Sequence, residues 1–175
     1  MMDNLYYRPL EVEDFETYLL LQEEALQNSP ELFGSDYESY QAISKLNKEQ
    51  LFEQFLDYPY NFLLACFNSS NIPIGMIGFS SKKDKTNLRH KGEIWGLYVK
   101  PDYRTKSIAT NLIQHVVDSA KENLGTEQIL LKVAVPNTKA YSLYLKLGFL
   151  VYGTEIRALK VDNQYVDEYL MIKLL

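Results

Sequence analysis

The stretch Glu93–Asn111 constrains the fold more than any other part of the chain. It reads Glu-Ile-Trp-Gly-Leu-Tyr-Val-Lys-Pro-Asp-Tyr-Arg-Thr-Lys-Ser-Ile-Ala-Thr-Asn. This pattern predicts a buried strand, a turn opened by Pro101, and the first turn of a long helix. Such a junction points several unpaired backbone N–H groups and the positive end of a helix dipole at one place. The stretch therefore predicts an anion-binding site.

The composition is that of a globular protein. The 175 residues are 46% hydrophobic and 23% charged, so a single domain over residues 1–175 can bury a sizeable core. No apolar run is long enough to cross a bilayer, and residues 1–9 lack the basic-then-apolar order of a signal peptide. We therefore expect no membrane association.

Cysteine and charge content restrict the location and the ligands. Cys66 is the only cysteine, so no internal disulfide can form and a reducing cytoplasm is the expected location. The net charge is −5 and no basic run exists to neutralise phosphates, which argues against nucleic-acid binding. No cluster of His, Cys, Asp or Glu has the spacing of metal ligands, so no metal is expected.

Hydrophobic periodicity predicts one α/β (α+β) domain around a mixed sheet of about seven strands, with about four helices. Strands are expected at residues 5–10, 60–67, 72–80, 90–100, 128–135, 149–160 and 164–174. Helices are expected at residues 11–27, 47–56, 107–123 and 137–147.

Several of these elements carry signals at their ends. Asn47 is expected to cap the second helix, and Gly125 to end the third. The strand at residues 128–135 is nearly continuous in apolar residues, which is typical of a strand buried on both faces. Asp162-Asn163 is a favourable turn pair between the last two strands.

The turn after the central strand resembles a known acyl-CoA motif. Its residues Arg104-Thr-Lys-Ser-Ile-Ala109 lack both Gly-x-x-x-x-Gly-Lys-Ser/Thr and Gly-x-Gly-x-x-Gly. They resemble motif A of the GCN5-related N-acetyltransferase (GNAT) family, Arg/Gln-x-x-Gly-x-Gly/Ala. Arg104 and Ala109 match that pattern, and Ser107 stands where the family has its first glycine.

A second motif strengthens the resemblance. Asn137-Thr-Lys-Ala140 followed by Tyr144-Leu-Lys-Leu-Gly148-Phe149 is similar to motif B of the family, and a predicted strand separates the two motifs. The resemblance covers about residues 72–174. It implies the GNAT fold, with a mostly antiparallel central sheet, and transfer of an acetyl group from acetyl-CoA to an amine.

The resemblance also implies where the cofactor binds. In the family, backbone N–H groups of the motif A turn hold the pyrophosphate, and here they belong to Arg104, Thr105, Lys106, Ser107, Ile108, Ala109 and Thr110. The hydroxyls and the ammonium among these residues suit phosphate oxygens. Ser107 adds a Cβ where the family prefers none, so the pyrophosphate is expected to sit slightly displaced. The alternative is that Ser107 only caps the helix.

Pantetheine would bind like an added strand beside the central one. By resemblance, the main chain of Leu97, Tyr98 and Val99 would supply its hydrogen-bond partners. Gly96 could mark a bulge that separates this strand from its neighbour. The alternative for the three residues is an ordinary place in a core strand.

Glu93 is the candidate general base. An alkylammonium, with a pKa of about 10.4, must lose a proton before its nitrogen can attack a thioester. Glu93 lies eleven positions before Arg104, where histone-type members of the family carry a catalytic glutamate. Alternatively, Glu93 faces solvent at a strand edge or pairs with His90 or Lys91.

Tyr144 is the candidate general acid. In the family, a tyrosine at this place in motif B lies near the sulfur of CoA and can protonate the leaving thiolate. The alternative is a core tyrosine, since the chain holds 14 of them. Asn137 has two compatible roles, as a helix cap and as a contact to the cofactor.

These residues predict an acetyl-CoA-dependent N-acetyltransferase that transfers the acetyl group directly to a primary amine of a small molecule or peptide. A non-catalytic acyl-CoA-binding regulatory module stays open because of Ser107. A protein N-terminal or lysine acetyltransferase is a third reading. Exposed aromatic residues in the last two strands make a homodimer plausible.

Overall fold

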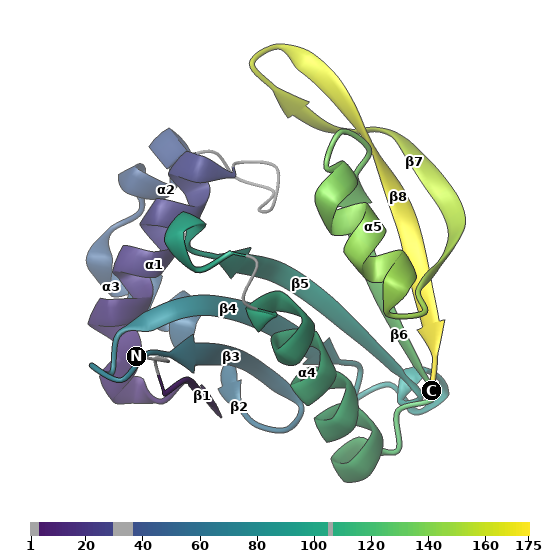
Figure 1. Cartoon of the computed structure of the whole chain (residues 1–175), viewed down its shortest axis with the longest axis horizontal. Coiled ribbons are helices and arrows are strands. Elements are labelled where there is room, and N and C mark those ends of the chain that lie inside the picture. The colour runs from purple at the N-terminus through teal and green to yellow at the C-terminus, as the bar shows by residue number, and fades with distance from the viewer. Residues whose placement is uncertain (1–3, 30–36, 105–106) are drawn as a thin grey trace.

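The computed structural model of the chain describes residues 4–29, 37–104 and 107–175. Its centre is one sheet in the order β1-β3-β4-β5-β6-β8-β7, and the short β2 pairs with β3 (Figure 1). The strands are β1 Tyr6–Pro9, β2 Leu56–Asp57, β3 Asn61–Phe67, β4 Pro73–Ser81, β5 Lys91–Val99, β6 Gln128–Ala134, β7 Leu150–Val161 and β8 Gln164–Leu174. The helices are α1 Phe15–Asn28, α2 Tyr37–Ala42, α3 Lys45–Glu53, α4 Ile108–Leu124 and α5 Thr138–Lys146.

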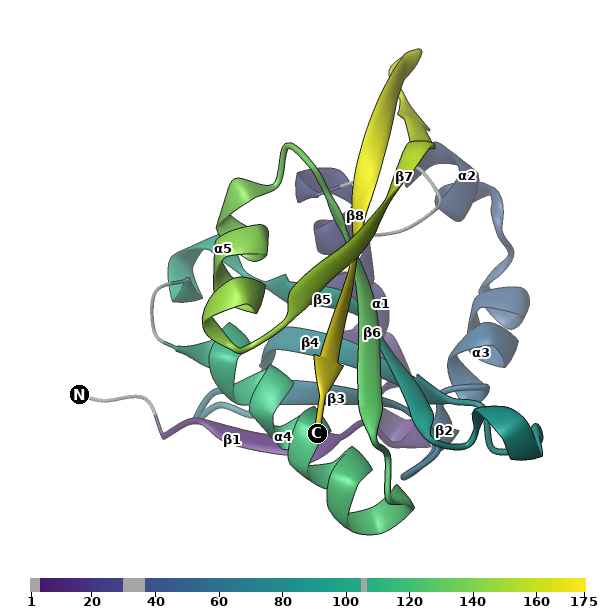
Figure 2. The same cartoon turned by 90° about the vertical axis from the view of Figure 1, so that its right-hand side faces the viewer.

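The expected mixed sheet is confirmed. Among the described strands, β5 and β6 form the only parallel pair, and every other pair is antiparallel. Helices cover both faces (Figure 2). One core packs α4 and α5 on the sheet around residues such as Phe79, Ile94 and Val116. The other packs α1 and α3 on the opposite face around Phe15 and Phe52.

The two central strands separate part-way along their length. β5 and β6 pair only from Lys91 opposite Gln128 to Glu93 opposite Leu130. Beyond Glu93 the strands diverge, with α5 beside the opening (Figure 1). The separation creates a gap in the middle of the sheet, at the carboxyl ends of both strands.

A bulge in β5 lies just beyond the last paired residue. Gly78 of β4 is opposite Trp95, whereas Met76 is opposite Tyr98, so two residues of β5 face one residue of β4. Gly96 has a φ of 63°, a left-handed conformation that glycine adopts without steric cost. The bulge expected at Gly96 is therefore confirmed.

Two local expectations were wrong. Ser44, not Asn47, caps α3, because its side chain accepts a hydrogen bond from the Asn47 N–H at 3.3 Å. β6 is not buried on both faces, since the side chain of Lys132 is 47% exposed while Leu131 and Val133 are buried. In a sequence pattern, the long aliphatic stem of Lys132 resembles an apolar residue, but the ammonium at its end requires water or a partner.

Other helix and hairpin ends agree with the sequence. Gly125 ends α4 with a φ of 61°, and Gly148 follows α5 with a φ of 85°. Asp162 and Asn163, between β7 and β8, have φ values of 48° and 61°, as a tight hairpin turn requires. No helix in the described ranges is long and apolar enough to cross a membrane.

Candidate active site

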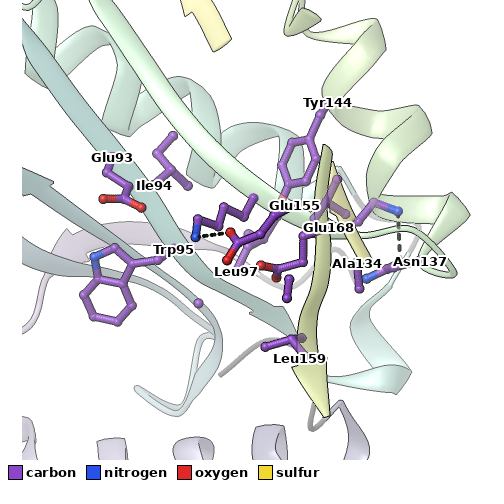
Figure 3. Close-up of a pocket in the computed structure, with 15 residues that line it drawn as sticks. Glu93, Ile94, Trp95, Leu97, Ala134, Asn137, Tyr144, Glu155, Leu159 and Glu168 are labelled. Atoms are coloured by element: carbon purple, nitrogen blue, oxygen red, sulfur yellow. Dashed lines mark hydrogen bonds and ion pairs between the residues drawn. The ribbon is translucent and has the colours of Figure 1, made fainter. Parts of the chain in front are cut away.

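A cavity of about 320 Å³ lies where β5 and β6 separate (Figure 3). Four strands and α5 contribute to its wall. Its lining combines apolar groups with several polar and charged side chains. The lining residues are Glu93, Ile94, Trp95, Gly96, Leu97, Lys132, Val133, Ala134, Asn137, Ala140, Tyr144, Glu155, Ala158, Leu159 and Glu168.

Tyr144 reaches this cavity from α5 (Figure 3). Its side chain is only 5% exposed, and its ring packs edge-on against Phe149 at 5.8 Å between centroids. No hydrogen bond joins its hydroxyl to any residue that the structure describes. Burial raises the pKa of Tyr144, so the phenol keeps its proton at neutral pH and can donate it in a hydrogen bond.

Asn137 positions the helix that carries Tyr144. Its side-chain oxygen accepts a hydrogen bond from the Ala140 N–H at 3.2 Å, which is the geometry of a helix N-cap. Asn137 also lines the cavity. The expected capping role is therefore confirmed, and contact with the cofactor stays a prediction.

Glu93 enters the same cavity from the other face of the sheet. Ile94 belongs to the core beneath α4, so the alternation of β5 turns Glu93 and Trp95 toward the face of α1 and α3. Trp95 is fixed there, because its ring lies 4.6 Å from that of Phe55 and its Nε1 donates to Ser80 Oγ at 3.0 Å. Glu93 is half-buried.

Three charged residues that the sequence did not single out share this face with Glu93. Lys132 Nζ lies 2.8 Å from Glu155 Oε2, and Glu155 is directly opposite Glu168 in the register of β7 and β8. All three line the cavity. Nothing in the sequence of the final hairpin indicated that these residues share a cavity with β5.

A second cavity, of about 300 Å³, lies at the amino end of α4. It is lined by Val99, Tyr103, Arg104, Ser107, Ile108, Ala109, Thr110 and Leu143. Arg104 Nε donates to the Val99 carbonyl at 2.9 Å, which ties the turn to the end of β5. The structure thus brings together the predicted pyrophosphate residues, except that Thr105 and Lys106 lie outside the described residues.

Ser107 occupies the N-cap position of α4 in a left-handed conformation, with a φ of 58° and a ψ of 12°. Its carbonyl accepts from the Asn111 N–H at 2.9 Å, but its side chain makes no capping hydrogen bond. A side-chain cap is therefore not its role. The left-handed backbone is a physical reason for a glycine at this position of the family motif.

The three predicted pantetheine residues differ in their surroundings. Leu97 lines the first cavity and Val99 the second. The side chain of Tyr98 points to the other face, where its hydroxyl donates to Glu24 Oε1 at 3.0 Å and accepts from Asn28 at 3.2 Å. The side chain of Tyr98 therefore lies outside both cavities, and its main chain faces β4, where it is paired with Met76.

The sequence matches a family model along most of its length. The model, described as the Acetyltransferase (GNAT) family, matches residues 20–149. The chain belongs to this family. GNAT acetyltransferases use acetyl-CoA, and the chain is accordingly an acetyltransferase. Within the described residues, no group of three or more His, Cys, Asp or Glu side chains could hold a metal ion.

Relatives with different acceptors are similar to this GNAT chain. An N-alpha-acetyltransferase from Saccharolobus solfataricus is 34% identical over 75% of this chain and 84% of its own. A spermidine N(1)-acetyltransferase from Thermoplasma acidophilum is 27% identical over 90% of this chain and 96% of its own. The structure of yncA from Salmonella typhimurium with its cofactor acetyl-CoA has a TM-score of 0.81 at 17% identity, over 98% of this chain and 94% of that one.

Proposed function

We propose that this GNAT protein is an N-acetyltransferase that moves the acetyl group of acetyl-CoA directly to a primary amine. The main support is the cavity between β5 and β6, which Glu93 and Tyr144 line from opposite faces of the sheet. A proton acceptor on one side and a proton donor on the other are what aminolysis of a thioester requires.

In the proposed reaction, Glu93 takes a proton from the acceptor ammonium, directly or through a water molecule. The amine nitrogen then attacks the thioester carbonyl carbon, whose oxygen is polarised by the main chain near Leu97. The C–N bond of the amide forms as the C–S bond breaks. Tyr144 supplies the proton that the leaving thiolate of CoA requires, and the proton that the nitrogen loses on forming the amide returns to Tyr144.

The cofactor would extend from one cavity to the other. Its pyrophosphate would bind at the amino end of α4, with Arg104, Ser107, Ile108, Ala109 and Thr110 around the second cavity. Lys100 N–H donates to Ile74 of β4, so strand alternation turns the peptide groups of Leu97 and Val99 toward the gap. Those groups are suited to pantetheine amides, although the Val99 carbonyl already accepts from Arg104.

Two kinds of acceptor are supported by the names of the relatives. The N-alpha-acetyltransferase from Saccharolobus solfataricus favours the α-amine of a polypeptide, and the spermidine N(1)-acetyltransferase from Thermoplasma acidophilum favours a small aliphatic amine. With either kind of acceptor, the group that attacks the thioester is a primary amine. The chemistry assigned to Glu93 and Tyr144 is the same for the two.

The proposal is tested by following thiol release from acetyl-CoA with a panel of amines and short peptides. Release that depends on an added amine, with formation of its amide, is the expected result. Tight CoA binding without turnover on any amine would instead favour the non-catalytic acyl-CoA-binding module, the alternative raised by Ser107.

We also propose that residues 1–175 form a single domain and that the protein acts in the cytoplasm.

A homodimer is a further part of the proposal. Tyr152 of β7 and Tyr165 of β8 are each 56% exposed, and large exposed aromatic side chains favour association. Sedimentation of the purified chain at several concentrations would measure its oligomeric state. A monomer at all concentrations would contradict this part.

A further inference from the structure

The cavity between β5 and β6 has an excess of negative charge. Three of its lining residues are carboxylates, Glu93, Glu155 and Glu168, and one is the ammonium of Lys132. The formal charge of the described lining residues is therefore −2. The three glutamates come from three different strands, β5, β7 and β8, so the fold and not a local acidic run brings them together.

Lys132, the one cation among the described lining residues, is already paired. Lys132 Nζ lies 2.8 Å from Glu155 Oε2, and this hydrogen bond raises the pKa of Lys132. Glu155 and Glu168 are directly opposite each other, an arrangement of like charges that destabilises a sheet. Burial raises the pKa of Glu168; Lys132 opposes that rise and Glu155 adds to it. The negative charge of Glu168 is thus only partly balanced by the positive charge of Lys132.

A separate observation indicates that this cavity receives a ligand. The hydroxyl of Tyr144 is carried by a side chain that is only 5% exposed and lines the same cavity. It has no hydrogen-bond partner among the described residues, so its donor and its acceptor are available to a molecule in the cavity. The carboxylates and this hydroxyl therefore belong to one binding site.

We propose that the acetyl acceptor is a dication: an aliphatic amine with a second ammonium or guanidinium group. The second group binds Glu168, with Glu155 beside it, while the reacting amine lies next to Glu93 and Tyr144. This inference rests on the proposed function, since it specifies the acceptor of that reaction. It favours a small dibasic amine over the α-amine of an uncharged polypeptide end.

The sheet register sets the separation of the two cationic groups. Glu93 is beside Leu130 of β6, and Glu168 is beside Ala134, four residues further along that strand. At the rise of a strand this is an offset of about 13 Å along the sheet, and β5 and β8 lie on either side of β6, about 10 Å apart across it. A two-carbon spacer is too short to engage both ends, whereas a spacer of four carbons or more fits.

The test uses four acceptors: 1,4-diaminobutane, 1,2-diaminoethane, n-butylamine and 4-aminobutyrate. We expect kcat/KM for 1,4-diaminobutane to exceed that for n-butylamine about tenfold, the effect of one hydrogen-bonded charge contact. 1,2-Diaminoethane should show little of this advantage, and 4-aminobutyrate should be the poorest acceptor. Equal kcat/KM for the first and third acceptors would overturn the inference.

Two variants separate the subsite from the chemistry. Glu168→Gln should raise KM for 1,4-diaminobutane about tenfold with little change in kcat, and should change KM for n-butylamine much less. Lys132→Met should lower KM for the diamine, because it removes a repelling charge and frees Glu155. Glu122→Gln, on the exposed side of α4, is the matched control and should change neither. An equal loss for both amines in Glu168→Gln would contradict the assignment.

A binding measurement keeps this inference distinct from the proposed function. Titration calorimetry of 1,4-diaminobutane into the CoA complex does not require turnover. If no amine is acetylated, but the diamine binds about tenfold more weakly to Glu168→Gln than to the wild type, the proposed reaction fails and the cation subsite stands. If amines are acetylated and the diamine binds both proteins equally, the subsite fails and the reaction stands.

Discussion

Glu93 and Tyr144 line one cavity from opposite faces of the same sheet. They can line the same cavity because β5 and β6 stop pairing after Glu93, which opens the sheet between the two strands. A thioester held in that gap would face a carboxylate on one side and a phenol on the other. This relationship underlies the first two predictions.

Tyr144→Phe should lower kcat about 100-fold while the dissociation constant of acetyl-CoA stays within a factor of two or so of the wild type. The substitution removes the proton donor but keeps the ring that packs against Phe149. Steady-state thiol release and calorimetry measure the two quantities. Tyr141→Phe, on the same helix and against Tyr169, is the control. Wild-type turnover in Tyr144→Phe would refute the role as general acid.

Glu93→Gln should lower kcat/KM about 100-fold at neutral pH. The loss should shrink as the pH approaches the pKa of the acceptor amine, about 10.4, because more acceptor then arrives already deprotonated. Rate profiles of the two proteins between pH 7 and about 10 check this expectation. A constant ratio across that range would show that Glu93 acts in binding and not as a base.

Ser107→Gly should stabilise the protein slightly. A left-handed φ of 58° costs a serine about 1 kcal/mol, and the greater freedom of glycine in the unfolded chain offsets part of that gain. We expect a rise in Tm of about 1 to 2 °C and an acetyl-CoA affinity equal to or higher than that of the wild type. Ser107→Ala keeps the unfavourable φ and should give no rise. Destabilisation by both substitutions would restore a capping role for the side chain.

Asp14→Asn should lower the free energy of unfolding by about 2 kcal/mol at pH 7. Arg8 contacts both carboxylate oxygens of Asp14, at 2.6 and 2.8 Å, and the Glu11 N–H donates to the same carboxylate at 2.8 Å. Glu13→Gln, exposed in the same turn, is the control and should cost little.

The pH dependence of that effect follows from the pKa of Asp14. The Arg8 guanidinium holds this pKa below its usual range, so Asp14 binds a proton less readily in the folded than in the unfolded chain. Its contribution is complete above the unfolded pKa of about 3.9 and is lost as the pH falls through the folded pKa. Denaturant unfolding should therefore show the two proteins converging at acidic pH. A difference that persists there would contradict the ion-pair explanation.

Much of the fold could be predicted from local patterns. The strand β5, the glycine that ends α4, and the turn at Asp162 and Asn163 depend on neighbours in the chain, so periodicity and turn chemistry identified them. The N-cap of α3 was misplaced because Ser44 and Asn47 are both good capping residues. Nothing in residues 44–47 favours Ser44 over Asn47 as the cap.

The candidate site, too, could be predicted from the sequence only in part. The motifs identified Glu93, Arg104, Ser107, Asn137 and Tyr144 in advance, because each lies at a fixed offset within a short pattern. The roles of Glu93 and Tyr144 stay predictions until the variants are measured. Glu155 and Glu168 could not be identified as site residues from the sequence, because no residue near them indicates that they share a cavity with β5.

The sequence by itself determined most of the elements, the bulge at Gly96 and the family, because these depend on local conformational preferences and on short motifs; the short α2 and β2 were not among them. Only the tertiary structure decided which charges share the cavity. The splay of β5 from β6 opens the sheet, and the register of β6, β7 and β8 then places Lys132, Glu155 and Glu168 on the face of Glu93. The physical reason is that side-chain alternation fixes two faces for every strand, but only strand pairing decides which faces coincide.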